Sequence, residues 1–192
     1  PAEARRTGLV SVYQEPSLIP DLDVAANLAL TDTPLEPFLA WVRELGITDL
    51  DLHALARELP LPTLRILDLA RALAAEPVVL LLDEMTAALP ADLTERVIDV
   101  IGRQRGERAV IFISHRLIEV TLLCDRATVL RDGETVGVLD VAPGAEDEIV
   151  ALMLGPAMTG GPLERGAPEA VAVPKRAAGP PRLAVRNLRA GS

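Results

Sequence analysis

The sequence predicts an α/β fold with a mostly parallel sheet flanked by helices. Two runs of apolar residues, 78–82 and 109–113, are uninterrupted, which is the pattern of strands buried on both faces in a parallel sheet covered by helices. Segments with apolar residues at helical spacing precede, separate and follow these runs. Strands that alternate with helices in this way indicate an α/β domain.

Composition narrows the functional classes. The chain has 192 residues, enough for one domain with a substantial core. Because 49% of the residues are hydrophobic and only 2% aromatic, Leu, Val, Ile and Ala must build that core. The net charge is −9 and the 19 basic residues form no long stripe, so no nucleic-acid partner is expected. No apolar run approaches the roughly 18 residues of a membrane span.

The first half of the chain predicts one strand and several helices. Residues 8–13 alternate loosely and predict a strand, followed by Gln14, Glu15 and Pro16, where the proline interrupts regular structure. A helix over 24–30 is capped by Asp21 or Asp23. Three more helices are predicted over 34–45 (stopped by Gly46), 52–59, and from Pro62 to just before Pro77.

The second half repeats the alternation and adds a hairpin. After the strand over 78–82, an amphipathic helix is ended by Gly102 or Gly106. The strand over 109–113 precedes a helix over 116–124. Two further strands flank Asp132-Gly133, a strong hairpin signal, and a last helix follows; these segments are 127–131, 134–139 and 147–154.

The composition changes after Gly155. Residues 156–181 are rich in Gly, Pro and Ala and predict a linker. Residues 182–188 (R-L-A-V-R-N-L) alternate again and resemble the first strand of a following domain. Because the sequence starts at Pro1 rather than Met, we expect it to be a slice of a longer protein.

Polar side chains stand where the predicted strands end. Asp83 and Glu84 close the first buried strand. Alternation would place them on opposite faces, but because the strand ends here, both can reach the carboxyl edge of the sheet, outside which ligands bind in open α/β folds. A single acid there is commonly an ion pair or a helix cap, but two acids after an apolar strand favour a site for magnesium and water. Ser114 and His115 close the second strand, and Gln14 closes the strand over 8–13.

The order and spacing of these segments resemble the nucleotide-binding domain of ABC transporters. V-Y-Q-E-P-S-L-I-P-D-L-D-V-A-A-N-L is similar to the Q-loop and its sequel, and L-D-L-A-R-A-L-A-A-E-P-V-V-L-L-L-D-E-M-T-A-A-L to the end of the signature helix and Walker B. I-F-I-S-H-R-L-I-E-V resembles the H-loop, and C-D-R-A-T-V-L-R-D-G-E-T-V-G the following hairpin. The Q-loop segment, S-H-R-L and V-L-R-D-G are most similar to the double-domain ATPases of simple-sugar importers, the ribose and galactose type.

The resemblance implies a domain layout. Residues 1–155 would be a partial P-loop NTPase domain, from Q-loop to H-loop and hairpin, with a helical subdomain at about 24–75. Residues 156–181 would be the linker and 182–192 the start of a second nucleotide-binding domain.

The same resemblance implies roles for the polar residues. Asp83 would hold Mg²⁺, Glu84 would orient or deprotonate the attacking water, and His115 would contact the γ-phosphate and hold Glu84. Gln14 would touch Mg²⁺ and water and transmit the nucleotide state to the membrane partner. A capping or surface histidine is the alternative for His115. His53 lacks such a context and is expected to be solvated, and Cys124, the single cysteine, to be a small buried apolar residue.

Partners and location also follow from the resemblance. The cofactors would be ATP and Mg²⁺. The intact protein would contact membrane permease subunits, a second nucleotide-binding domain and, indirectly, a periplasmic or extracellular sugar-binding protein. It would lie peripherally on the cytoplasmic face of the cell membrane and couple ATP hydrolysis to sugar import.

Three departures from the family pattern put activity in doubt. The sequence contains no G-x-x-x-x-G-K-[ST], and its only lysine, Lys175, has unsuitable neighbours, so ATP binding and turnover by this chain alone are not expected. The signature segment, which in the family reads much like L-S-G-G-Q, ends here in Pro60, Leu61, Pro62 and Thr63, and the two prolines have no amide hydrogen to offer a phosphate. Met85 and Pro90 replace a proline and an aspartate that are usual after Walker B.

These departures leave three interpretations open. The domain is an ATPase that tolerates subfamily differences, or it is degenerate and serves as a scaffold or regulatory half, or the chain is a truncated gene product. A soluble ABC ATPase of the repair or translation type is disfavoured by the sugar-like Q-loop and the hairpin.

Overall fold

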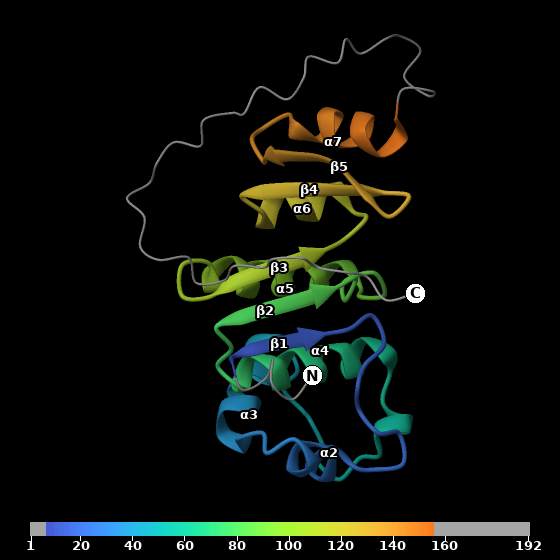
Figure 1. The fold of residues 1–192 in the computed structure, drawn as a ribbon. Helices are drawn as coiled ribbons and strands as arrows, with labels where there is room; N and C mark the ends of the chain where they lie inside the picture. Colours follow the sequence, from blue (N-terminus) through green and yellow to red (C-terminus); the bar gives the residue numbers. More distant parts are fainter. Residues whose placement is uncertain (1–6, 156–192) are drawn as a thin grey trace. The chain divides into compact units, whose positions relative to one another are not determined.

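The computed structural model describes residues 7–155 (Figure 1). The predicted linker over 156–181 and the predicted strand within 182–192 lie outside the described residues. No helix of the described part is both long and apolar enough to cross a lipid bilayer.

A three-stranded parallel sheet organises the described chain. Its strands are β1 (Leu9–Val12), β2 (Val79–Asp83) and β3 (Ala109–Ile113), with β2 in the middle. Val12 pairs with Leu82, and Asp83 pairs with Ile113, so the three strands end almost level. Their arrowheads point the same way in Figure 1, as the sequence predicted for a parallel sheet.

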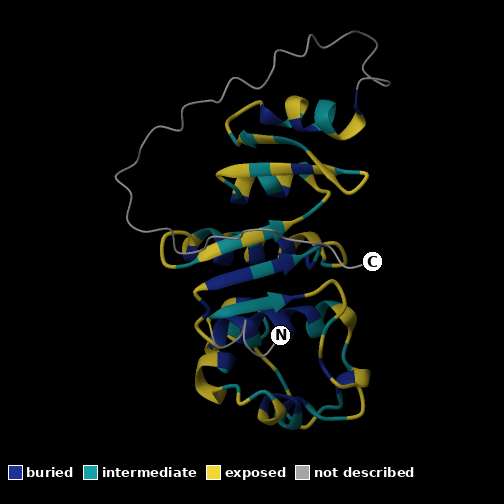
Figure 2. Ribbon diagram, viewed as in Figure 1, coloured by how far each residue is buried: buried dark blue, intermediate teal, exposed yellow. Residues whose placement is uncertain are grey.

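Helices of the described part cover one face of this sheet. Leu80 and Leu82 are fully buried in a core that also contains Ile66, Leu69 and Leu73 of α4 (Leu61–Ala74) and Val97, Val100 and Ile101 of α5 (Ala91–Gln104). Within residues 7–155, the prediction of burial on both faces holds at the centre of β2, where Val79 is 4% exposed and its neighbour Leu80 is fully buried, and it is wrong for β3. Ile111 and Ile113 of β3 are 39% and 45% exposed, and β3 has exposed bands in Figure 2. Val78, just before β2, is 46% exposed.

Two short helices precede α4, as predicted. Helix α2 (Val24–Leu30) begins after Asp23, whose carboxylate accepts a 2.7 Å hydrogen bond from the Ala26 amide. Asp23 rather than Asp21 is therefore the cap. Helix α3 (Leu35–Glu44) ends before Gly46, which has a φ of 98°, a left-handed conformation that glycine adopts without strain.

The helix predicted over 52–59 is wrong: only a 3₁₀ turn, η1 (Ala56–Glu58), forms there. The backbone of this segment pairs instead with the start of α2. The Val24 amide donates to the Ala54 carbonyl, and the Ala56 amide donates to the Leu22 carbonyl. Because these groups are committed to another segment, they are not available for hydrogen bonds within a helix.

The last part of the described chain is a helix, a hairpin and a helix. Helix α6 (Leu117–Leu123) precedes β4 (Arg126–Arg131) and β5 (Glu134–Asp140), which pair antiparallel, and α7 (Ala145–Leu154) follows. Asp132 and Gly133 have φ of 53° and 80°, the two positive values that a tight hairpin turn requires. Gly106, with a φ of 98°, follows α5, whereas Gly102 lies inside it.

Cys124 is half-buried and packs against the main core, so the expectation of a buried apolar residue is met in part. Burial raises the pKa of the Cys124 thiol, partly offset by the nearby Arg105 guanidinium. We therefore expect Cys124 to react with iodoacetamide more slowly than free cysteine at pH 8, because only the thiolate is the nucleophile. Urea-unfolded chain should react at the free rate. Equal rates for folded and unfolded chain would contradict this prediction.

Candidate functional site

The predicted site residues follow the carboxyl ends of neighbouring strands. Gln14 is exposed in the bend after β1, Asp83 is the last residue of β2 with Glu84 next to it, and His115 follows β3 by two residues. Because the strands are parallel and end almost level, these residues share one edge of the sheet. This is the edge at which open α/β sheets bind ligands.

Glu84 and His115 are in direct contact. The His115 Nδ1 atom lies 3.1 Å from Glu84 Oε1, with the Glu84 side chain 30% and the His115 side chain 61% exposed. The Glu84 amide donates a 3.0 Å hydrogen bond to the Ile113 carbonyl, which extends the pairing of β2 and β3 by one residue. The two residues are 31 positions apart in the sequence, and the pairing of β2 with β3 brings them together.

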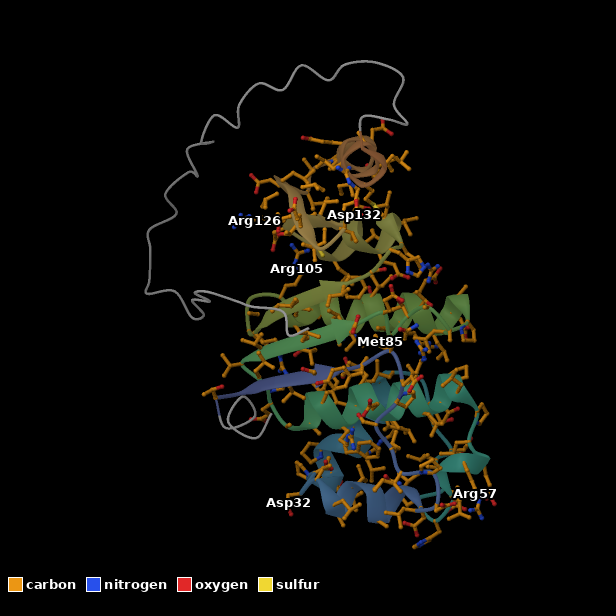
Figure 3. All side chains as sticks on the ribbon, turned by 45° about the vertical axis from the view of Figure 1, so that its right-hand side comes forward. Asp32, Arg57, Met85, Arg105, Arg126 and Asp132 are labelled. Carbon is orange, nitrogen blue, oxygen red and sulfur yellow. The ribbon has the colours of Figure 1, made fainter. Side chains whose placement is uncertain are left out.

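The backbone of Glu84 has an unusual conformation that hydrogen bonds from α4 stabilise. Its φ is 45°, a left-handed conformation that costs a non-glycine residue about 1 kcal/mol or more. Arg65 of α4, a buried residue, donates through Nη1 to the carbonyls of Glu84 and Met85, at 3.1 and 2.8 Å. The Met85 side chain is fully buried, close to the arrowhead of β2 in Figure 3. These contacts stabilise the strained turn that presents the Glu84 carboxylate.

Asp83 and Gln14 have the oxygen donors that Mg²⁺ prefers. Within residues 7–155, no hydrogen bond or ion pair engages the Asp83 carboxylate or the Gln14 amide, and Asp83 is half-buried at the sheet edge. The described chain also has no group of three His, Cys, Asp or Glu side chains that would form a metal site. Mg²⁺ commonly takes one or two protein oxygens and completes its shell with waters and phosphate oxygens, so these residues fit it.

The signature-like segment Pro60–Thr63 lies at the start of α4. Pro60 is the N-cap and makes no side-chain cap, while Pro62 occupies the first turn, as predicted. No hydrogen bond among the described residues joins this segment to Glu84 or His115. Its connection to them runs through Arg65, two residues further along the same helix.

Buried charges near the site were not predicted from the sequence. Arg65, Asp68 and Glu119 are each buried, with side chains that bind other segments. A signal was present for two of them. Arg65 precedes Leu69 by four residues, and Glu119 precedes Leu123 by four, so each charge lies on the inward face of its helix.

Comparison with known proteins identifies the relatives of this chain. No family model matches it. A ribose import ATP-binding protein of Mesorhizobium japonicum is 36% identical over 170 residues, covering 81% of this chain and 32% of that protein. Proteins of the same name from Streptomyces avermitilis and Geobacillus kaustophilus are 37% and 36% identical, each over 81% of this chain. Over most of its length, the chain is therefore similar to ribose import ATP-binding proteins.

The fold agrees with this similarity. A dimeric ATP-binding cassette in a post-hydrolysis state, bound to ADP and Pi, superposes with a TM-score of 0.65 over 73% of this chain and 66% of that one, at 21% identity. A dimeric bacterial ABC transporter cassette gives a TM-score of 0.66 over the same shares. The chain spans about a third of the length of the curated relatives that it matches (32% to 34%).

Proposed function

We propose that this chain is part of the ATP-binding subunit of a sugar importer, in which ATP hydrolysis is coupled to transport. The observation that carries the proposal is the contact between Glu84 and His115 at the carboxyl edge of a parallel sheet. The similarity to ribose import ATP-binding proteins supports ATP as the nucleotide and a sugar as the transported substrate.

Glu84 is the proposed general base. Its carboxylate would orient the attacking water and accept its proton, while the imidazole of His115 would hold the carboxylate through Nδ1 and contact the terminal phosphate. The exposure of both side chains, 30% and 61%, leaves them accessible to a nucleotide. The catalytic contribution of the protein is then mostly positioning and charge stabilisation.

Asp83 and Gln14 are the proposed magnesium ligands, because their side-chain oxygens have no partner within residues 7–155 and both residues follow adjacent strands. When bound, Mg²⁺ neutralises charge on the phosphates. The position of Gln14, in the exposed bend after β1, also suits a residue that relays nucleotide state to a neighbouring subunit.

The proposed layout extends beyond the described residues. Residues 1–155 would belong to the first nucleotide-binding domain, 156–181 to a linker and 182–192 to the second domain. Permease subunits would dock near Gln14 and the helical segment within 24–75, on the cytoplasmic face of the membrane. A sugar-binding protein on the opposite side would act through the permease.

A second candidate is a degenerate domain that serves as scaffold or regulator. Pro60 and Pro62 favour it, since neither can donate an amide hydrogen to a phosphate at the start of α4. The retained Glu84–His115 contact favours the ATPase. Reading the coding sequence upstream of Pro1 distinguishes them: G-x-x-x-x-G-K-[ST] within about 80 residues supports the ATPase, and its absence supports the scaffold.

We expect the 192-residue chain alone to show no ATP turnover above a protein-free control. The sequence offers neither glycine-rich amides nor a suitable lysine to cradle the β- and γ-phosphates. Phosphate release measured with MgATP checks this. Turnover by this chain that is abolished in Glu84→Gln would contradict the prediction and would place a complete site within the 192 residues.

A further inference from the structure

Glu119 is a buried carboxylate that bonds to both loops of the candidate site and that the proposed mechanism does not use. Its side chain is 1% exposed on α6, and a carboxylate removed from water is costly unless its oxygens are well partnered. Oε2 accepts hydrogen bonds from the Thr86 hydroxyl at 2.7 Å and from the Ser114 hydroxyl at 3.2 Å. Oε1 forms an ion pair with Arg116 at 2.5 Å.

The two hydroxyls belong to the two loops that carry the site. Thr86 follows Glu84 by two residues in the turn after β2, and its side chain is buried as well. Ser114 immediately precedes His115 after β3 and also accepts a 3.0 Å hydrogen bond from the Arg116 amide. One carboxylate oxygen therefore joins the loop that carries Glu84 to the loop that carries His115.

The Glu84–His115 contact needs such support. His115 is mostly exposed, and its hydrogen bond with Glu84 is the one that the described chain provides for its ring. A partly exposed pair of this kind does little to fix its own geometry, because water competes for both partners. A buried, hydrogen-bonded carboxylate is a stronger constraint, because leaving its partners unpaired carries a larger cost.

We propose that Glu119 is a positioning residue that sets the distance between Glu84 and His115 by clamping Thr86 and Ser114 together. Within residues 7–155, its carboxylate bonds to Thr86, Ser114 and Arg116 and to neither side chain of the pair. The inference rests on the proposed function for its catalytic consequence. The geometric part, the coupling of the two loops, stands independently of any nucleotide.

The coupling is measured by NMR on the chain in a His53→Gln background. His53 is the only other histidine, and its side chain is 86% exposed, so this change leaves the His115 ring as a single set of signals. The change in the His115 ring shifts caused by Glu84→Ala, which removes the carboxylate that His115 contacts, reports the contact. We expect Glu119→Leu to reduce that change by about half or more, and Glu119→Gln, which keeps an acceptor oxygen, to preserve it.

Thr86 provides a second arm in case Glu119→Leu does not fold. Thr86→Val removes the hydroxyl at constant shape and should also reduce the response, whereas Thr86→Ser should keep it. Leu69→Ala is the stability control: it opens the core beside α4 without touching the clamp, so the response should stay at its full size. A full response in both Glu119→Leu and Thr86→Val overturns the proposal.

Turnover separates this inference from the proposed function. In the longer gene product, Glu119→Leu should lower kcat about tenfold or more at little change in KM, and Glu119→Gln should restore most of it. ATPase activity that needs Glu84 but is unaffected by Glu119→Leu overturns the positioning role and leaves the function intact. NMR coupling through Glu119 in a product that hydrolyses no ATP supports the clamp and overturns the function.

Discussion

Replacing Glu84 with glutamine should slow ATP hydrolysis by about 100-fold or more in a gene product that also contains the phosphate loop, because a positioned general base contributes roughly 10²- to 10⁴-fold. Glutamine keeps the size of the side chain and can still bond to His115, whose Nδ1 lies 3.1 Å from Glu84 Oε1. Nucleotide affinity should therefore change little. Steady-state phosphate release gives kcat, and fluorescent nucleotide titration gives the dissociation constant.

Glu95→Gln is the matched control for this experiment. Glu95 lies on α5, is exposed, and has no place at the sheet edge, so the same chemical change there should leave turnover at the parental rate. Parental turnover by Glu84→Gln would mean that this half of the protein does not hydrolyse ATP. It would favour the scaffold, with Pro60 and Pro62 as the reason.

Much of the fold could be predicted because each signal is local. The apolar runs in β2 and β3, the cap at Asp23 and the Asp132-Gly133 turn each act within a few residues, and each forms as expected. The segment over 52–59 could not be predicted in this way. Its backbone groups bond to residues 20–25, and helical spacing in one segment contains no information about a distant competitor.

The prediction that β3 is buried on both faces failed for a related reason. An all-apolar strand indicates that its side chains favour burial, but it does not indicate which elements cover them. In residues 7–155 α4 and α5 supply one face, and Ile111 and Ile113 remain exposed on the other. The apolar pattern correctly predicted parallel pairing of β3, and it wrongly predicted that both faces of β3 are covered.

In the candidate site, too, residues with a local signal were predicted and residues that act through long-range contacts were not. Gln14, Asp83, Glu84 and His115 were found because each ends a predicted strand, and parallel strands gather their ends at one edge. The residues that bond to the loops of Glu84 and His115 were missed, since Arg65 acts on carbonyls about 20 residues away in sequence and Glu119 joins the nearby Ser114 to the distant Thr86. A charged residue four positions before a core leucine is the local signal that would have found both.

Asp68→Ala should destabilise the folded chain by about 3 kcal/mol or more, the cost of leaving one partner of a buried ion pair alone. Asp68 and Arg71 have side chains only 2% and 11% exposed and form a close ion pair on α4. The Asp68 carboxylate also accepts hydrogen bonds from the Ser17 amide at 3.2 Å and from its hydroxyl at 3.1 Å. Total stabilities are commonly about 5 to 15 kcal/mol, so the loss would be a large fraction.

Urea unfolding followed by the fluorescence of Trp41, the only tryptophan, measures this loss, because Trp41 lies on α3 and packs against the core. The midpoint should fall by about 1 to 2 M. Asp21→Ala is the matched control: Asp21 also pairs with an arginine, Arg57, but the side chains are 80% and 54% exposed, so water replaces the lost partner and the midpoint should not move measurably. Equal shifts for the two variants would mean that burial of Asp68 is not what makes its pair strong. Because Ser17 lies three residues after Gln14, the loss of Asp68 would also release the segment that follows the proposed magnesium ligand, so in a longer gene product that contains the phosphate loop, ATP turnover and stability should decline together.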